Sequence, residues 1–298
     1  MANLKELRVR IGSIKNTRKI TAAMSRIAAA RLSKAQHAIL AARPYGAGLR
    51  GMVQDLLDAV PAMDRPQVHP LLRDDPRRCV WVVAMNADRG LCGGFNANVH
   101  KVASKMLDEL DAEGVDVRLV CVGRKAQAYF SHFGRPILRF FSAPEPATVE
   151  GLAPEVARYL ADAFCGRLED DDVPQPDEIR LVSNRFVSVL TQEVRTEILL
   201  PVTRREGEAR ETPPPRAEPS EIELLRHLLP VYVENEVREA MLDSMAGEVA
   251  ARRMAMDAAT DNATELIADL TLEYNRERQA AITKELMEII GGAEALAG

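Results

Sequence analysis

The chain has 298 residues, of which 47% are apolar and 4% aromatic, and its formal net charge is −5. The apolar content is ordinary for a folded protein, and no run of about eighteen apolar residues is present that could cross a membrane. The N-terminus lacks the apolar stretch of a signal peptide, so we expect a mature N-terminus of the bacterial type.

The net charge hides an opposition between the two ends of the chain. Residues 1–50 hold eleven basic residues against one acid, Glu6, whereas residues 220–298 hold seven basic residues against sixteen acids. Two long helical segments of opposite charge favour pairing with each other. We therefore expect an antiparallel coiled coil of the two termini, with the middle of the chain as a separate domain.

The first sixty residues have the spacing of one long helix. Steps of three and four residues predict a single seam. Its members are Leu4, Leu7, Ile11, Ile14, Arg18, Thr21, Ser25, Ala28, Leu32, Ala35, Ile39 and Ala42. Pro44 predicts a kink or a short break, and the helical pattern resumes and stops before Pro61. The basic face is expected to be solvated or to meet a partner, because few aromatic side chains are present to stack on bases.

The middle of the chain has the pattern of a layered α/β domain. Predicted strands cover 80–85, 117–123, 136–141, 178–186 and 194–202, and predicted helices cover 96–110, 125–133 and 149–164. Strands that alternate with helices indicate a mostly parallel sheet covered on both faces, with Rossmann-like layering. The last two strands are expected to form a hairpin around 188–192.

A glycine-containing loop, NADRGLCGGFN (86–96), joins the first strand to the first helix. Such loops bind nucleotide phosphates in several α/β folds. This loop has no Gly-Lys-Ser/Thr ending and does not match GxGxxG. A tight turn with positive φ at Gly90, Gly93 and Gly94 is therefore favoured over a nucleotide site.

No pattern typical of a catalytic or metal site is found. The histidines His37, His69, His100, His132 and His227 are scattered, without an acid or nucleophile at motif spacing. The cysteines Cys79, Cys92, Cys121 and Cys165 form no CxxC pair and have no histidine at ligand spacing, so we interpret them as reduced and mostly buried. We expect no catalytic residue, no metal and no cofactor.

The C-terminal part begins after a charged, proline-rich segment, 203–219, which is typical of a solvated linker. Ser220 and Glu223 predict a helix N-cap with a capping box. The helical pattern then runs to about Ile290, with one apolar stripe at Leu266, Leu270 and Tyr274 and another at Ile282, Leu286 and Ile289. Gly291 and Gly292 predict the end of this helix.

Three segments, in the same order, resemble the gamma subunit of the F-type ATP synthase, the central rotor stalk. They are RIGSIKNTRKITAAM with AAARLSKAQ (10–24, 28–36), DRGLCGGFN (88–96), and RRMAMDAATDNATELI with LTLEYNRERQAAITKELMEIIGGAEAL (252–267, 270–296). The resemblance covers essentially the whole chain. One departure is Arg26, a charge next to the seam.

The resemblance implies a rotor without bond chemistry of its own. It implies partners in the alpha and beta subunits of a catalytic hexamer, in an epsilon subunit and in the membrane c-subunit ring, with no nucleic acid and no direct insertion into lipid. It also implies a peripheral position on the cytoplasmic face of the bacterial inner membrane. Rotation would bias each catalytic subunit by contacting its states differently.

The resemblance also suggests which side chains meet the surrounding subunits. The candidates for transient hydrogen bonds are Arg253, Arg278, Gln279, Thr283 and Glu288. Arg89 is a further candidate, with the alternative that it fixes its own loop. No catalytic, cofactor-binding or metal-binding residue is implied.

Two other interpretations remain open from the residues. One is a cytosolic coiled-coil scaffold with a nucleotide-binding α/β head, and the other is an enzyme whose helices serve only for oligomerisation. In all three cases the expected division is a helix over 1–60, an α/β domain over 77–202, a linker over 203–219 and a helix over 220–298.

Overall fold

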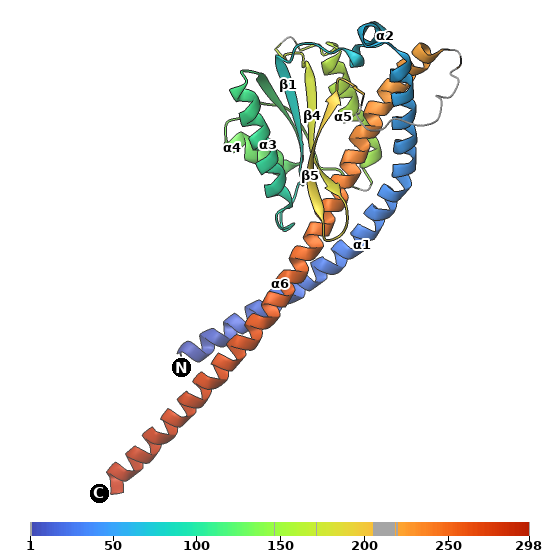
Figure 1. The fold of residues 1–298 in the computed structure, drawn as a ribbon. Helices are drawn as coiled ribbons and strands as arrows, with labels where there is room; N and C mark the ends of the chain where they lie inside the picture. The colour runs from blue at the N-terminus through green and yellow to red at the C-terminus, as the bar shows by residue number, and fades with distance from the viewer. Residues whose placement is uncertain (1, 146, 171, 205–217, 219, 298) are drawn as a thin grey trace. The chain divides into compact units, whose positions relative to one another are not determined.

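The computed structural model describes residues 2–297, apart from 146, 171, 205–217 and 219 (Figure 1). Most of the predicted linker therefore lies outside the described residues. Contacts divide the chain into two units, Met1–Ala29 with Arg252–Gly298, and Ala30–Ala251. The long helices α1 (Ala2–Ala59) and α6 (Glu221–Ala297) contribute to both units.

The second unit contains a five-stranded sheet in the order β3-β2-β1-β4-β5. The strands are β1 (Cys79–Met85), β2 (Asp116–Val122), β3 (Ile137–Phe141), β4 (Glu178–Phe186) and β5 (Gln192–Leu200). The first four are parallel, and β5 pairs antiparallel with β4. The predicted mostly parallel sheet with a terminal hairpin is confirmed.

Helices cover both faces of this sheet (Figure 1). They are α3 (Phe95–Ala112), α4 (Arg124–His132) and α5 (Val149–Phe164). Side chains alternate along β1, because successive residues of a strand point to opposite faces. Val80 and Val82 join the core beneath α3 and α4, whereas Trp81 lies against Tyr159 of α5, with 5.8 Å between ring centroids.

Three short elements connect α1 to β1: η1 (Ala62–Asp64), α2 (Arg65–Val68) and η2 (Pro70–Leu72). In the same unit, α1 and α6 run antiparallel and bury the predicted seam, including Leu32, Ala35 and Ile39. Arg50 Nη1 of α1 lies 2.8 Å from a carboxylate oxygen of Glu236 and 2.8 Å from one of Glu239 on α6. The predicted charge pairing of the two helices is confirmed at this point.

Helix α1 passes through Pro44 without a break, so the predicted short break is wrong. Proline deprives the carbonyl four residues earlier, that of Leu40, of its helical hydrogen bond. Leu40 lies on the exposed face of the helix, where water can take the place of that bond. Burial of the flanking Ala42 and Leu49 keeps the helix continuous.

The predicted start of helix α6 agrees with the structure, whereas the predicted end does not. Ser220 Oγ accepts a hydrogen bond from the Glu223 N–H at 3.2 Å, so the predicted N-cap is confirmed. The helix continues to Ala297, so the predicted stop at Gly291 and Gly292 is wrong. Glycine in a helix costs about 1 kcal/mol relative to alanine, and the good helix formers that follow offset this cost.

Candidate functional site

The first unit is an antiparallel pair of helical segments. Thr21 Oγ1 and Thr260 Oγ1 lie 2.7 Å apart, and the Ser25 hydroxyl donates to Asp257 Oδ1 at 2.5 Å. Thr21 and Ser25 belong to the seam that sequence spacing predicted for α1, whereas Thr260 and Asp257 were not assigned to a seam from the sequence. The polar middle of the seam is therefore satisfied by hydrogen bonds across the two helices.

Buried and half-buried positions recur every three or four residues on both segments. On α1 they include Leu4, Leu7, Ile11, Ile14, Arg18, Thr21, Ser25 and Ala28, and on α6 they include Met256, Thr260, Ala263, Ile267, Leu270, Tyr274 and Glu277. The predicted α1 seam is confirmed, and Arg26 is exposed outside it. On α6, Leu270 and Tyr274 belong to the seam, whereas Leu266 lies off it and is 41% exposed.

This unit exposes more apolar side chains than it buries. Among its described side chains, the buried apolar ones are Leu7, Ala28, Met256, Ala263 and Leu270. The large exposed ones are Val9, Ile20, Ile27, Leu266, Leu272, Ile282, Leu286, Met287, Ile289 and Ile290. Exposed apolar side chains that gather on one part of a molecule mark an interaction surface. We call these ten residues the exposed apolar set.

Four of the predicted contact residues lie on the last part of α6. Arg278, Gln279, Thr283 and Glu288 are all exposed. The pairing of Thr21 with Thr260, continued at the same spacing, brings Ala2 level with about residue 279. The part of α6 that follows therefore extends past the start of α1 within this unit. Lys284 Nζ lies 3.8 Å from Glu288 Oε1.

Arg253 differs from these four. Its Nε lies 3.8 Å from Asp257 Oδ2, and Asp257 in turn accepts the hydrogen bond from Ser25. The guanidinium is thus linked to α1 through a second side chain, while 42% of the Arg253 side chain is exposed. It remains accessible to a partner.

The loop after β1 is held by residues that the sequence analysis did not single out. Asp88 Oδ1 accepts hydrogen bonds from the backbone N–H of Arg124 at 2.8 Å and of Ala143 at 3.0 Å. Asn96 Oδ1 accepts one from the N–H of Ala87 at 3.1 Å. Asp88 therefore joins the loops that follow three different strands. The position of Asp88 just after a predicted strand was the feature of the sequence that could have indicated this role.

The side chain of Arg89 is exposed, and its carbonyl oxygen accepts from Asn96 Nδ2 at 3.4 Å. Positive φ occurs at Gly93 (54°) but also at Leu91 (62°), and φ at Gly94 is −81°. The expectation of positive φ is thus confirmed for Gly93 and wrong for Gly90 and Gly94. Leu91 adopts a conformation that is uncommon for a non-glycine residue, at a side chain that is 62% exposed.

Helix α6 covers the crevice in which doubly wound sheets bind nucleotides. That crevice lies at the carboxyl ends of β1 and β4, where the strand order reverses. Ala251 of α6 forms a buried cluster with Ala87, Cys92 and Phe95. A Cβ atom on Gly247 would lie 2.4 Å from Asn184 Oδ1. Helix α6 and the carboxyl ends of the strands are in direct contact, so the protein's own side chains fill the place where a nucleotide would bind.

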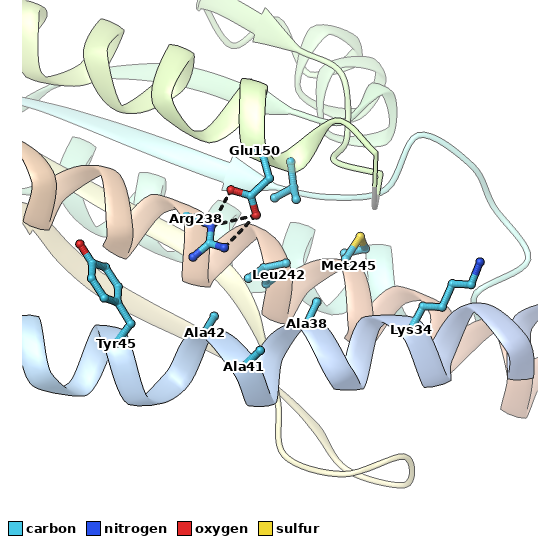
Figure 2. A pocket seen from close by; sticks show the side chains of 10 residues that line it. Lys34, Ala38, Ala41, Ala42, Tyr45, Glu150, Arg238, Leu242 and Met245 are labelled. Atoms are coloured by element: carbon cyan, nitrogen blue, oxygen red, sulfur yellow. Dashed lines mark hydrogen bonds and ion pairs between the residues drawn. The ribbon is translucent and has the colours of Figure 1, made fainter.

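A hollow of about 450 Å³ lies between α1, α5 and α6 (Figure 2). Alanines of α1, namely Ala38, Ala41 and Ala42, form one wall. At its rim, Arg238 Nη2 of α6 lies 2.8 Å from Glu150 Oε1 of α5, and Arg238 Nε lies 3.1 Å from both carboxylate oxygens. This forked ion pair ties α5 to α6.

Two of the four cysteines, Cys79 and Cys121, are unsuited to nucleophilic chemistry. Burial raises the pKa of Cys79 to about 11 and that of Cys121 to about 12, so both thiols stay protonated at neutral pH. Among the described residues, no group of His, Cys, Asp and Glu side chains has the arrangement of a metal site. None of the described helices is long and apolar enough to cross a membrane.

The similarity to known proteins extends over essentially the whole chain. The family model described as ATP synthase matches residues 3–296. The ATP synthase gamma chain of Geobacter sp. strain M21 is 41% identical, with 100% of both chains covered. That of Maricaulis maris is 42% identical over 99% of this chain and 100% of the relative.

Solved structures share the fold. A chain of the Euglena gracilis mitochondrial ATP synthase (OSCP/F1/c-ring, rotational state 3) matches with a TM-score of 0.67 at 19% identity, covering 99% of this chain and 95% of that chain. A chain from the Tetrahymena thermophila mitochondrial ATP synthase (central stalk/c-ring) matches with a TM-score of 0.59 at 21% identity, covering 80% and 99%.

Proposed function

The chain belongs to the ATP synthase gamma-chain family, and from this premise we propose that it turns inside a catalytic hexamer and couples proton flow through the membrane sector to ATP synthesis. It is a rotor stalk subunit of the ATP synthase. In this proposal the alpha and beta subunits surround the helical segments, and the epsilon subunit and the c-subunit ring meet the α/β domain. This chain itself is peripheral, on the cytoplasmic face of the bacterial inner membrane.

The exposed apolar set carries this proposal. A helical pair that exposes Ile20, Ile27 and Leu272 while burying few apolar residues of its own is suited to an enclosing partner. From Ile282 to Ile290 the described side chains of α6 are exposed, and five of them are large and apolar, at positions 282, 286, 287, 289 and 290. Such a surface fits a low-friction bearing, because apolar contacts have no directional requirement.

Polar contacts to the hexamer would be made by the exposed residues Arg278, Gln279, Thr283 and Glu288, together with Arg253 and, from the α/β domain, Arg89. Exposed ion pairs contribute about 1 kcal/mol or less, so they can break and re-form as the rotor turns. In this role the chain contributes no catalytic residue. Residues 1–60 and 220–298 serve as the axle, 77–202 as the domain outside the hexamer and 203–219 as the linker.

The test uses the whole ATP synthase, assembled in cells whose own gamma gene is replaced by this one. Leu286→Glu with Ile289→Glu places charges in the exposed apolar set, and Glu285→Gln is the matched control on the same turn. ATP-driven proton pumping into membrane vesicles is expected to fall several-fold in the double variant and to stay unchanged in the control. If cells that lack this chain retain coupled ATP synthesis, or if the purified chain hydrolyses nucleotide alone, the proposal is wrong.

The scaffold with a nucleotide-binding head is not favoured. Gly247 and Ala251 of α6 cover the carboxyl ends of β1 and β4, where a nucleotide would bind in such a head. The full-length match to gamma chains also leaves no segment that would need another explanation.

A further inference from the structure

Asp243 of α6 lies where three elements meet in the second unit. The backbone of Phe186, at the end of β4, is near enough to the Asp243 carboxylate to lower its pKa. Arg43 of α1 donates from Nη2 to the Phe186 carbonyl at 3.1 Å, and the same nitrogen lies 3.7 Å from Asp243 Oδ1. A single carboxylate thus joins both long helices to the last residue before the β4–β5 turn.

The carboxylate is incompletely satisfied. Within the described part of the chain, Asp243 Oδ1 is buried and has no hydrogen-bond partner. A cavity of about 20 Å³ adjoins it, lined by Ile39, Ala42, Arg43, Glu239, Leu242 and Asp243. An ionised oxygen without a donor is costly in such a place, whereas a protonated carboxyl is tolerated.

The charges that face Asp243 come from every element packed against it. Arg43 faces it from α1, Arg185 from β4 and Glu239 from α6 itself. Glu239 is held in place by Arg50. Burial is the largest influence and, with the repulsion from Glu239, raises the pKa of Asp243 to about 6; Arg43, Arg185 and the Phe186 backbone offset this only in part.

We propose that Asp243 is a proton-sensitive joint, which holds the β4–β5 hairpin tightly against α1 and α6 when it is protonated and less tightly when it is ionised. The joint is a property of this chain alone and does not depend on the rotor role. The hairpin turn that it controls exposes two apolar side chains, Val187 at 53% and Leu190 at 81%. Proton uptake would therefore change how firmly an exposed apolar surface is held.

The direction of the pH dependence follows from the pKa of Asp243 in the folded and unfolded states. The folded pKa, about 6, is above the ordinary value of 3.8. The stabilisation from Asp243 is therefore complete below pH 3.8 and is lost as the pH rises towards and through 6. Above this range the joint stays in its weaker, ionised form.

The test is hydrogen–deuterium exchange of the full chain at matched pH, comparing the wild type with Asp243→Asn in peptides that cover 187–191. Intrinsic exchange rates cancel in the ratio between the two proteins. The ratio of wild-type to variant exchange is expected to be near one below pH 3.8, to rise as the pH increases towards 6, and to level off above that range at no more than about a hundredfold. Asp261→Asn, an exposed carboxylate on the same helix, is the matched control and is expected to give a ratio of one throughout.

A ratio that does not change with pH would overturn the proposal. A carbon-detected NMR titration of the Asp243 carboxyl in the wild type supplies a second measurement that does not depend on the variant. A midpoint near 6 supports the joint, and a midpoint near 4 overturns it.

Discussion

Thr21 and Thr260 place their hydroxyl oxygens 2.7 Å apart, although 239 residues separate them in the sequence. One hydroxyl donates to the other, and the second donates to a carbonyl of its own helix, for which the Arg18 oxygen lies 3.1 Å from Thr21 and the Met256 oxygen 2.8 Å from Thr260. The hydrogen-bonding groups of these two threonines are thus satisfied at a level of the helix pair that has no apolar packing. It marks the level at which the two segments of the first unit face each other.

This relationship predicts a cross-link. Thr21→Cys with Thr260→Cys, in a Cys165→Ser background, is expected to form a disulfide rapidly under mild oxidation, because the two side chains meet directly. The readout is mobility on a non-reducing gel. The matched control is Thr21→Cys with Thr264→Cys, one turn further along α6, where Thr264 is exposed and slow cross-linking is expected. Equal rates for the two pairs would contradict the pairing.

Asp88 is predicted to be a main support of the loop edge of the sheet. Asp88→Ala removes the acceptor of two backbone N–H groups and is expected to lower the free energy of unfolding by about 2–4 kcal/mol. Asp88→Asn keeps an oxygen at the same position and is expected to cost about 1 kcal/mol or less. Urea titration measures both. If Asp88→Asn lowers the free energy of unfolding as much as Asp88→Ala does, the charge of Asp88, not its hydrogen bonding, holds the loop.

Arg50 is predicted to be necessary because two carboxylates depend on it. Its side chain is 20% exposed, and the neighbouring Glu236 and Glu239 raise its pKa, although burial opposes them most strongly. Arg50→Met removes the cation that lies between the two acids and is expected to cost about 3 kcal/mol at pH 8.

The loss in Arg50→Met should shrink at pH 5, because the two carboxylates that Arg50 no longer holds can then take up a proton. Arg50→Lys is the matched control and is expected to retain part of the stability at pH 8. Denaturant unfolding at the two pH values provides the measurement, and a loss in the methionine variant that is independent of pH would contradict this explanation.

The forked pair of Glu150 and Arg238 in Figure 2 is predicted to contribute little. The Glu150 side chain is 67% exposed, and exposed pairs are screened by salt. Glu150→Gln is expected to lower the free energy of unfolding by about 1 kcal/mol or less, and the difference should disappear in about 1 M salt. A loss that persists in high salt would indicate a packing role.

His100 predicts a pH dependence opposite in sign to that of Asp243. Burial lowers its pKa most, the charge of Lys125 lowers it further, and the Lys125 carbonyl opposes this shift. The folded state therefore prefers neutral His100, and its contribution is present above pH 6.5 and lost as the pH falls through the lowered folded pKa. The His100→Gln variant should therefore lose less stability between pH 7 and pH 5 than the wild type, as measured by thermal unfolding.

Much of the fold could be predicted because periodicity is local. The seam from Leu4 to Ala42 and the strands of the α/β domain follow from side-chain spacing, since the α-helix and the β-strand each repeat at a fixed interval. Two of the failed predictions, the break at Pro44 and the helix end at Gly291–Gly292, concern residues whose known helix-breaking tendency was outweighed by the helix formers around them. Propensity of one residue is a weak guide when its neighbours agree.

The amino-acid sequence by itself determined the kind of protein: two oppositely charged helices, one before and one after a mostly parallel α/β domain, with motifs that resemble one family. Only the tertiary structure decided which polar groups act together, as Asp88 does with Arg124 and Ala143, and Asp243 with Arg43 and Phe186. The reason is physical. Spacing along the chain records which face a residue occupies, but the burial and charge around it come from segments that are distant in sequence.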